Sequence, residues 1–111
     1  MTTTIGIPKM VVVQCGSLTT LDDIKHISDD ILAELKDGAD ILLVELAGAQ
    51  YHPEKLALCM LDCRRLRQHF GNRTHIRFWG CVPTPECLRH LGRSAFRVYP
   101  DLESVIKSLA H

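Results

Sequence analysis

Residues 41–46, ILLVEL, limit the possible folds of this chain more than any other segment. The run contains a single charged side chain, which is typical of a strand covered on both faces. Helical periodicity precedes it and follows it. Two parallel strands in one sheet need a crossover of about a dozen residues or more, usually a helix. A covered strand between two helical segments therefore predicts an α/β fold with a mostly parallel sheet.

The segment before this run has the period of an amphipathic helix. Thr20 and Asp23 have the spacing of a capping pair, and Gly38 suits the left-handed residue that often ends a helix. The apolar residues of this predicted helix recur at three- and four-residue spacing: they are Leu21, Ile24, Ile27, Ile31, Leu32 and Leu35.

The segment after the run predicts a second helix, entered through a polar turn, GAQYHPEK, at residues 48–55. Pro53 suits the first helical position, and Glu54 suits the positive end of the helix dipole. The helical spacing continues until Gly71. The predicted buried stripe consists of Leu56, Cys59, Met60, Cys63, Leu66 and Phe70.

The remaining segments complete the predicted order β-β-α-β-α-β-α-β-α. Further strands are predicted at residues 4–7, 10–15, 75–80 and 95–99. A short helix is predicted at residues 84–92, and Asp101 is predicted to cap a last helix with one apolar stripe of Leu102, Val105, Ile106 and Leu109. We expect a single domain over residues 1–111, with a mixed, mostly parallel sheet of four to five strands and four helices.

Composition and charge argue against several classes of function. Thirteen basic and thirteen acidic side chains leave no formal net charge, so no overall field attracts nucleic acid or a membrane surface. No apolar run approaches the roughly twenty residues of a membrane span. The first ten residues, MTTTIGIPKM, lack the features of a secretory signal. Five cysteines without that signal predict free thiols and a cytoplasmic location.

Two Cys-x5-Arg spacings match the spacing of cysteine phosphatases. They run from Cys59 to Arg65 and from Cys87 to Arg93. Phosphatase chemistry needs a thiolate in a phosphate-binding loop that follows a strand and opens a helix. The first spacing lies inside a predicted helix, and the second has its helix and strand in the reverse order. We therefore predict no catalytic residue and no enzyme.

The cysteines and histidines also lack the spacing of a structural zinc site. The candidate ligands are Cys81, Cys87, His90, His69 and His75, and none forms a Cys-x2-Cys pair. Cys59 and Cys63 lie on the predicted buried stripe, where a free cysteine behaves as a small apolar residue. We therefore predict neither a metal site nor a cofactor.

The order of elements and several motifs resemble the STAS domain, named for sulfate transporters and anti-sigma factor antagonists. VVVQCGSLTTLDDIKHISDDIL is similar to the family's second strand, its Gly-x-Leu turn and its first helix. ILLVELAGAQY is similar to the central strand and the turn that follows it. IRFWGCVPTPECLRHLGRSAFRVYPDLESVIKSL is similar to the family's last strands and helices. The resemblance implies a regulatory protein-interaction module that is not an enzyme.

One turn departs from the pattern of this family. Antagonists that are phosphorylated carry Asp-Ser-Ser-Gly at the strand-to-helix turn, where a partner kinase modifies one serine. The aligned residues here are 53–56, PEKL, and the only hydroxyl between Gly48 and Leu58 is the phenol of Tyr51. The usual serine switch is therefore absent. The Glu54 carboxylate supplies a charge there, but it lacks the second charge and the third oxygen of a phosphoserine.

The resemblance places the contact with a partner at the turn of residues 48–56 and on the helix after it. The predicted partner-binding residues are Tyr51, His52, Glu54, Lys55, Arg64 and Arg67. Arginine pairs well with carboxylates at interfaces, so an acidic protein is a better partner than RNA, which would require stacking aromatic side chains. Tyr51, His52 and Glu54 have no nucleophile beside them in the sequence, which favours capping and partner contact over acid/base chemistry.

The resemblance leaves the kind of partner open. The partner is an anti-sigma factor or similar kinase in one interpretation. In a second, the chain is a scaffold or an accessory subunit of a larger complex or transporter. A third interpretation is a sensor of a small ligand such as a nucleotide or a lipid. A homodimer is compatible with each of them, and none requires insertion into a membrane.

Overall fold

The structure, a computed structural model, describes residues 8–82, 84–86, 89 and 97–110. Its elements are β1 (Met10–Gln14), β2 (Ser17–Leu18), α1 (Leu21–Lys36), β3 (Ile41–Glu45), β4 (Gln50–Tyr51), α2 (Pro53–His69), β5 (His75–Trp79), β6 (Val98–Tyr99) and α4 (Leu102–Leu109). This order confirms the α/β class. The predicted edge strand at residues 4–7 and most of the predicted helix at 84–92 lie outside the described residues, so both stay predictions.

Four strands form one sheet in the order β1-β3-β5-β6, and each neighbouring pair is parallel. The register places Val13, Val44 and Phe78 side by side across the sheet. β2 and β4 form a separate, two-stranded parallel sheet. The sequence predicted residues 17–18 and 50–51 as turns, which is wrong, because each segment gains a short strand from its pairing with the other.

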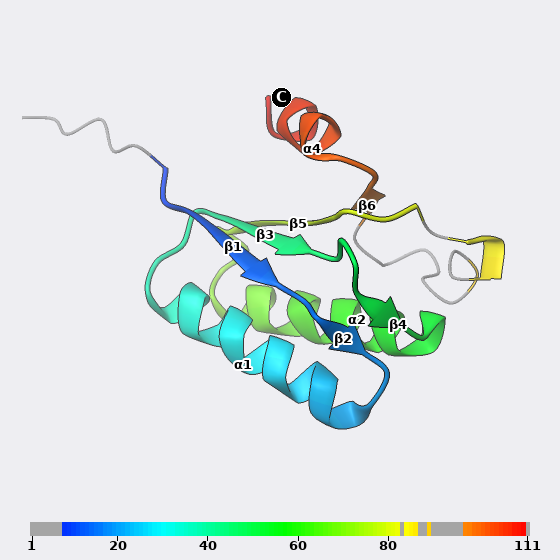
Figure 1. Cartoon of the computed structure of the whole chain (residues 1–111). Helices are drawn as coiled ribbons and strands as arrows, with labels where there is room; N and C mark the ends of the chain where they lie inside the picture. The colour runs from blue at the N-terminus through cyan, green and yellow to red at the C-terminus, as the bar shows by residue number, and fades with distance from the viewer. Residues whose placement is uncertain (1–7, 83, 87–88, 90–96, 111) are drawn as a thin grey trace, which may run out of the picture.

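Helices cover both faces of the sheet. α1 and α2 lie side by side on one face, and α4 lies on the other (Figure 1). On β3, Leu42 and Val44 point to the α1 and α2 side, while Leu43 points the opposite way, and all three are buried. The central strand is therefore covered on both faces, as its apolar run predicted. In the described part of the chain, no helix has both the length and the apolar character needed to cross a bilayer.

The start of α1 confirms the predicted capping pair. The Thr20 hydroxyl accepts a hydrogen bond from the Asp23 N–H at 3.1 Å, and the Asp23 carboxylate accepts from the Thr20 N–H at 3.1 Å. The same carboxylate accepts from the Thr19 N–H at 3.0 Å, and these hydrogen bonds, that from Thr19 first, lower the Asp23 pKa to about 2. Gly38, with φ of +82°, adopts the predicted left-handed conformation after the helix.

The last helix is less buried than its apolar stripe suggested. Asp101 caps it as predicted, accepting from the Ser104 N–H at 2.8 Å. Val105 is fully buried, whereas Leu102 and Ile106 are exposed. α4 lies over β5 and β6, and one edge of its apolar stripe faces solvent.

Candidate functional site

The candidate site is the corner between β3 and α2, residues 46–56. The Leu46 N–H donates to the Trp79 carbonyl at 2.7 Å, which joins the corner to β5. The His52 N–H donates to the Leu18 carbonyl at 3.0 Å, which joins it to β2. Hydrogen bonds to both neighbours hold the corner in a defined position, so that it presents a fixed surface.

Gly80 allows the corner to pack closely against the end of β5. Its φ is +107°, a conformation that other residues rarely adopt. A Cβ atom at this position would lie only 2.6 Å from the backbone nitrogen of Ala47. The approach of the two chain segments therefore depends on the missing side chain of Gly80.

The predicted residues of the turn differ in exposure. His52 is the exposed N-cap of α2 and forms no side-chain capping bond, and Glu54 is exposed in the first turn. Lys55 is half-buried. Tyr51 is half-buried as well and forms a hydrogen bond with the Cys81 thiol. Burial raises the pKa of this thiol, although the hydrogen bond with Tyr51 acts in the opposite direction. The corner therefore presents the imidazole of His52 and the carboxylate of Glu54 to solvent.

Arg64 and Arg67 lie toward the opposite end of α2. At 1.5 Å per residue, Arg67 is roughly 20 Å along the helix from Pro53. Its Nε donates to the Thr74 carbonyl at 2.7 Å, and a terminal nitrogen donates to the Asn72 carbonyl at 3.4 Å. Arg67 thus holds the loop that follows α2. Arg64 is exposed. The structure does not bring these two arginines together with the corner.

Two leucines on α2 belong to the surface next to the corner, and the predicted binding residues did not include them. Leu58 and Leu61 are 45% and 48% exposed. With Glu54 and Arg65 they follow helical spacing along one side of α2, which we call the α2 stripe. These leucines lie off the buried stripe of the same helix. That mismatch was visible in the sequence and could have identified them.

A groove of about 470 Å³ lies beside the α2 stripe, between α1 and α2. Leu21 of α1 and Leu58 of α2 both line it, and Leu21 is 69% exposed. Arg65 donates two hydrogen bonds to the Asp62 carboxylate, at 2.7 and 3.1 Å. Burial opposes the charged form of Asp62, but its polar contacts, the pair with Arg65 among them, outweigh this and lower its pKa. The groove can accept an apolar side chain between charged residues.

The hydroxyl groups near β2 are occupied by the cap of α1. The Ser17 hydroxyl donates to the Asp23 carboxylate at 3.0 Å, and the Thr19 hydroxyl donates to it at 3.2 Å. Thr20 supplies the cap itself. All three hydroxyls therefore take part in fixing the start of α1.

The thiols of Cys15, Cys59 and Cys63 lie in the core, and Cys59 and Cys63 are fully buried, which confirms the core packing predicted for that pair. Burial raises the Cys15 pKa to about 11, and a hydrogen bond with Cys59 together with burial raises the Cys63 pKa.

The Cys-x5-Arg spacing from Cys59 to Arg65 does not form a phosphate-binding loop, because Cys59 is buried in a helix and Arg65 pairs with Asp62. Cys87 and Arg93 lie outside the described residues.

The other candidate metal ligands do not assemble into a site among the residues that the structure describes. No group of three or more His, Cys, Asp or Glu side chains there is placed to hold a metal ion. His90, like Cys87, lies outside those residues. The sequence's candidate ligands therefore gain no support from the part of the fold that is described.

Comparisons with known proteins place the chain in no family. A scan against protein-family models finds no match, and a search of curated proteins finds no significant relative. The resemblance to STAS domains therefore depends on the motifs and the order of elements alone.

Proposed function

We propose that this chain is a non-enzymatic docking module that binds a partner protein through the β3–α2 corner and the α2 stripe. The observation that carries the proposal is the exposed pair Leu58 and Leu61 on the helix that begins at this corner. Neighbouring exposed apolar side chains between charged residues are typical of protein interfaces. The adjacent groove, open between α1 and α2, extends this surface.

Apolar burial would supply most of the affinity at this surface. Covering the exposed half of each leucine contributes about 1 kcal/mol, since complete burial of a leucine contributes about 1.5–3 kcal/mol. Glu54 and Arg65 at the two ends of the α2 stripe would supply specificity, because exposed charges influence partner choice and association rate more than affinity. A complementary partner offers apolar side chains with a cation near Glu54 and a carboxylate near Arg65.

The resemblance to STAS domains suggests that this docking module has a regulatory role. In that family the corresponding turn and helix contact a partner such as an anti-sigma factor with kinase activity. The absence of a serine in this turn means that partner binding here would not be switched by phosphorylation at the usual position. Partner binding would then depend on the state or on the concentration of the partner.

Affinity capture from the native host tests this surface when it is made with matched variants. Leu58→Asp with Leu61→Asp should abolish recovery of the partner, and Glu54→Lys with Lys55→Glu should reduce it. Leu102→Asp with Ile106→Asp makes the same chemical change on the exposed edge of α4 and should leave recovery intact. Equal recovery with the Leu58/Leu61 variant and the α4 variant would eliminate the α2 stripe as the interface.

Two related functions remain to be separated from a regulatory one. A scaffold or transporter subunit would use the same docking surface without any signalling. Genes for an anti-sigma factor beside this one would support regulation, whereas genes for a transport complex would support the scaffold. A sensor would retain its ligand, and native mass spectrometry of the purified chain would detect the added mass.

A further inference from the structure

β1 has a neighbouring strand on one side only in the part of the chain that the structure describes. It pairs with β3, and Figure 1 shows it along the outer edge of the sheet with α1 beneath it. The edge is five residues long, from Met10 to Gln14. An open edge of this kind can pair with a further strand through its backbone.

The hydrogen bonds of β1 show which of its backbone groups face outward. The Lys9 carbonyl accepts from an N–H of β3 at 3.0 Å, and the Cys15 N–H donates to a carbonyl of β3 at 2.9 Å. Backbone groups of alternate residues in a strand point to opposite sides. The N–H and C=O groups of Met10, Val12 and Gln14 therefore point away from β3 and can bind another strand.

Acidic side chains of α1 lie along this edge. A groove of about 270 Å³ is lined by Val12, Val13, Gln14, Asp30, Ala33 and Glu34. Its lining thus includes two carboxylates and no basic side chain. Neither Asp30 nor Glu34 forms an ion pair with any residue that the structure describes.

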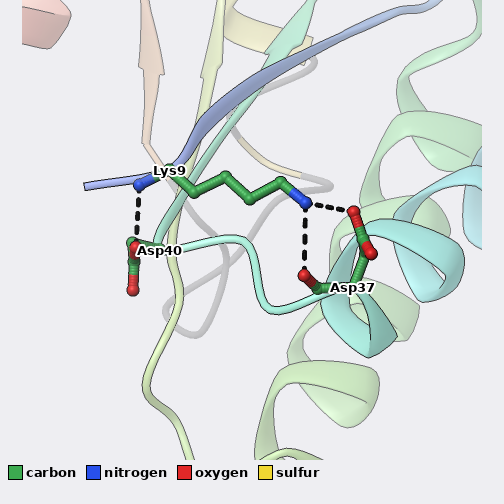
Figure 2. A network of polar contacts seen from close by, with 3 residues as sticks. All are labelled: Lys9, Asp37 and Asp40. Carbon is green, nitrogen blue, oxygen red and sulfur yellow. Dashed lines mark hydrogen bonds and ion pairs between the residues drawn. The ribbon is translucent and has the colours of Figure 1, made fainter. Parts of the chain in front are cut away.

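The lysine next to β1 is bound elsewhere. The Lys9 ammonium pairs with the Asp37 carboxylate and donates to the Asp37 carbonyl at 3.2 Å, as Figure 2 shows. The Lys9 N–H donates to the Asp40 carboxylate at 2.8 Å (Figure 2). These bonds fix the start of β1 to the loop between α1 and β3. Asp37 is therefore the bonded partner of the Lys9 ammonium, whereas the Glu34 carboxylate interacts with this charge only at longer range and without a direct ion pair.

We propose that β1 accepts an extended basic segment of a partner protein as an added strand, with its cations paired to Asp30 and Glu34. In strand addition, main-chain hydrogen bonds supply affinity and alternate side chains supply specificity. One set of side chains of the added strand faces the α1 flank. The other set lies beside Met10 and Val12, which are 53% and 51% exposed. The segment therefore alternates basic and apolar residues over about five positions.

A second copy of this chain fits the edge less well than a basic segment does. Antiparallel pairing of β1 with its own copy around Val12 would bring the two α1 flanks toward each other. Each flank carries Asp30 and Glu34 next to the groove, and like charges at close range disfavour association. A basic segment has the opposite charge. None of these residues belongs to the α2 stripe, so the two surfaces can be tested separately.

The test uses the full chain and a labelled peptide, Lys-Val-Lys-Val-Lys-Val-Lys. We expect the peptide to bind about tenfold more tightly than Glu-Val-Glu-Val-Glu-Val-Glu, measured by fluorescence anisotropy. It should also slow amide hydrogen exchange at Met10, Val12 and Gln14. Asp30→Lys with Glu34→Lys should weaken binding about tenfold. Asp22→Lys with Glu103→Lys, an equal change of net charge at exposed positions outside both grooves, should alter it less than about twofold.

N-methylated peptides separate strand addition from simple charge attraction without changing the protein. Methyl groups on the odd-numbered or on the even-numbered residues block opposite sides of the added strand, so we expect one of the two sets to abolish binding. Undiminished binding of both sets would overturn the proposal. Slow exchange at the three amides without peptide would also overturn it. If the protein dimerises as its concentration rises, slow exchange without peptide would mean that a second copy pairs with β1. If the protein is a monomer, it would mean that residues 1–7 of the chain itself pair with β1.

Discussion

α1 and α2 lie side by side against the same face of the sheet, yet their starts and outer surfaces differ. α1 begins with a complete capping box around Asp23, whereas α2 begins at His52 without a side-chain cap. Leu21 in the first turn is the one large apolar side chain that α1 exposes, while α2 presents Leu58 and Leu61 to solvent. The comparison teaches that the start of α1 is arranged for stability, whereas α2 combines a stable inner side with an apolar outer side suited to binding.

The buried sides of the two helices should contribute equally to stability, and Ala substitutions there should have the largest effect. Ile31 of α1 and Leu56 of α2 are both fully buried. Replacing either with Ala should lower the free energy of unfolding by about 2–5 kcal/mol, because each change removes apolar contacts and leaves a cavity. Urea denaturation measures this. A small loss at Leu56 alone would show that α2 is held less tightly than α1.

The two helix starts should differ in how much stability is lost when the N-cap residue is replaced by Ala. Thr20→Ala removes the hydroxyl that accepts the Asp23 N–H, and it should reduce the free energy of unfolding by about 1 kcal/mol. His52→Ala removes no capping bond and should change it by less than about 0.5 kcal/mol. The same denaturation experiment compares them, and an equal loss at both positions would contradict the difference drawn between the two starts.

Acid should weaken the start of α1. The folded-state pKa of Asp23 is about 2, below its ordinary value of 3.8. A lowered pKa adds stability above the ordinary value, and that contribution is lost as pH falls from about 4 through 2. The melting temperature of Asp23→Asn should therefore converge on that of the parent protein over this range, measured by circular dichroism. A constant difference between the two proteins down to pH 2 would exclude the linkage.

The outer leucines should give only a small change in stability. Leu58→Ala and Leu61→Ala remove side chains that are already about half exposed, so each should change the free energy of unfolding by less than about 0.5–1 kcal/mol. Partner binding should nevertheless fall, measured on the same preparations by calorimetry with the captured partner. A large loss of stability would mean that these leucines serve the fold and not an interface.

Local features of this chain were predictable from its sequence because they depend on neighbouring residues. The cap at Thr20 and Asp23, the start of α2 at Pro53 and the buried run of β3 all follow from short patterns. The exposed positions of Leu58 and Leu61 could also have been inferred, since they do not fit the period of the buried stripe. For such features, helix geometry relates sequence spacing directly to position in space.

Features that depend on distant contacts could not be predicted in the same way. β2 and β4 are strands only because two short segments meet across the fold. The bonds of Arg67 require the chain to reverse direction at Gly71 and Asn72, both of which have positive φ. The acidic edge beside β1 depends on the order of strands in the sheet. Sequence spacing alone contains none of this information.

The buried thiols of the core can report how often the folded chain opens. An alkylating reagent attacks the thiolate form of cysteine, and Cys15, Cys59 and Cys63 are closed to solvent in the folded chain. Their labelling therefore has to wait until the helices separate from the sheet. The labelling rate in mild conditions records how often that opening occurs, so an occupant that holds the layers together would slow it, wherever on the surface it binds.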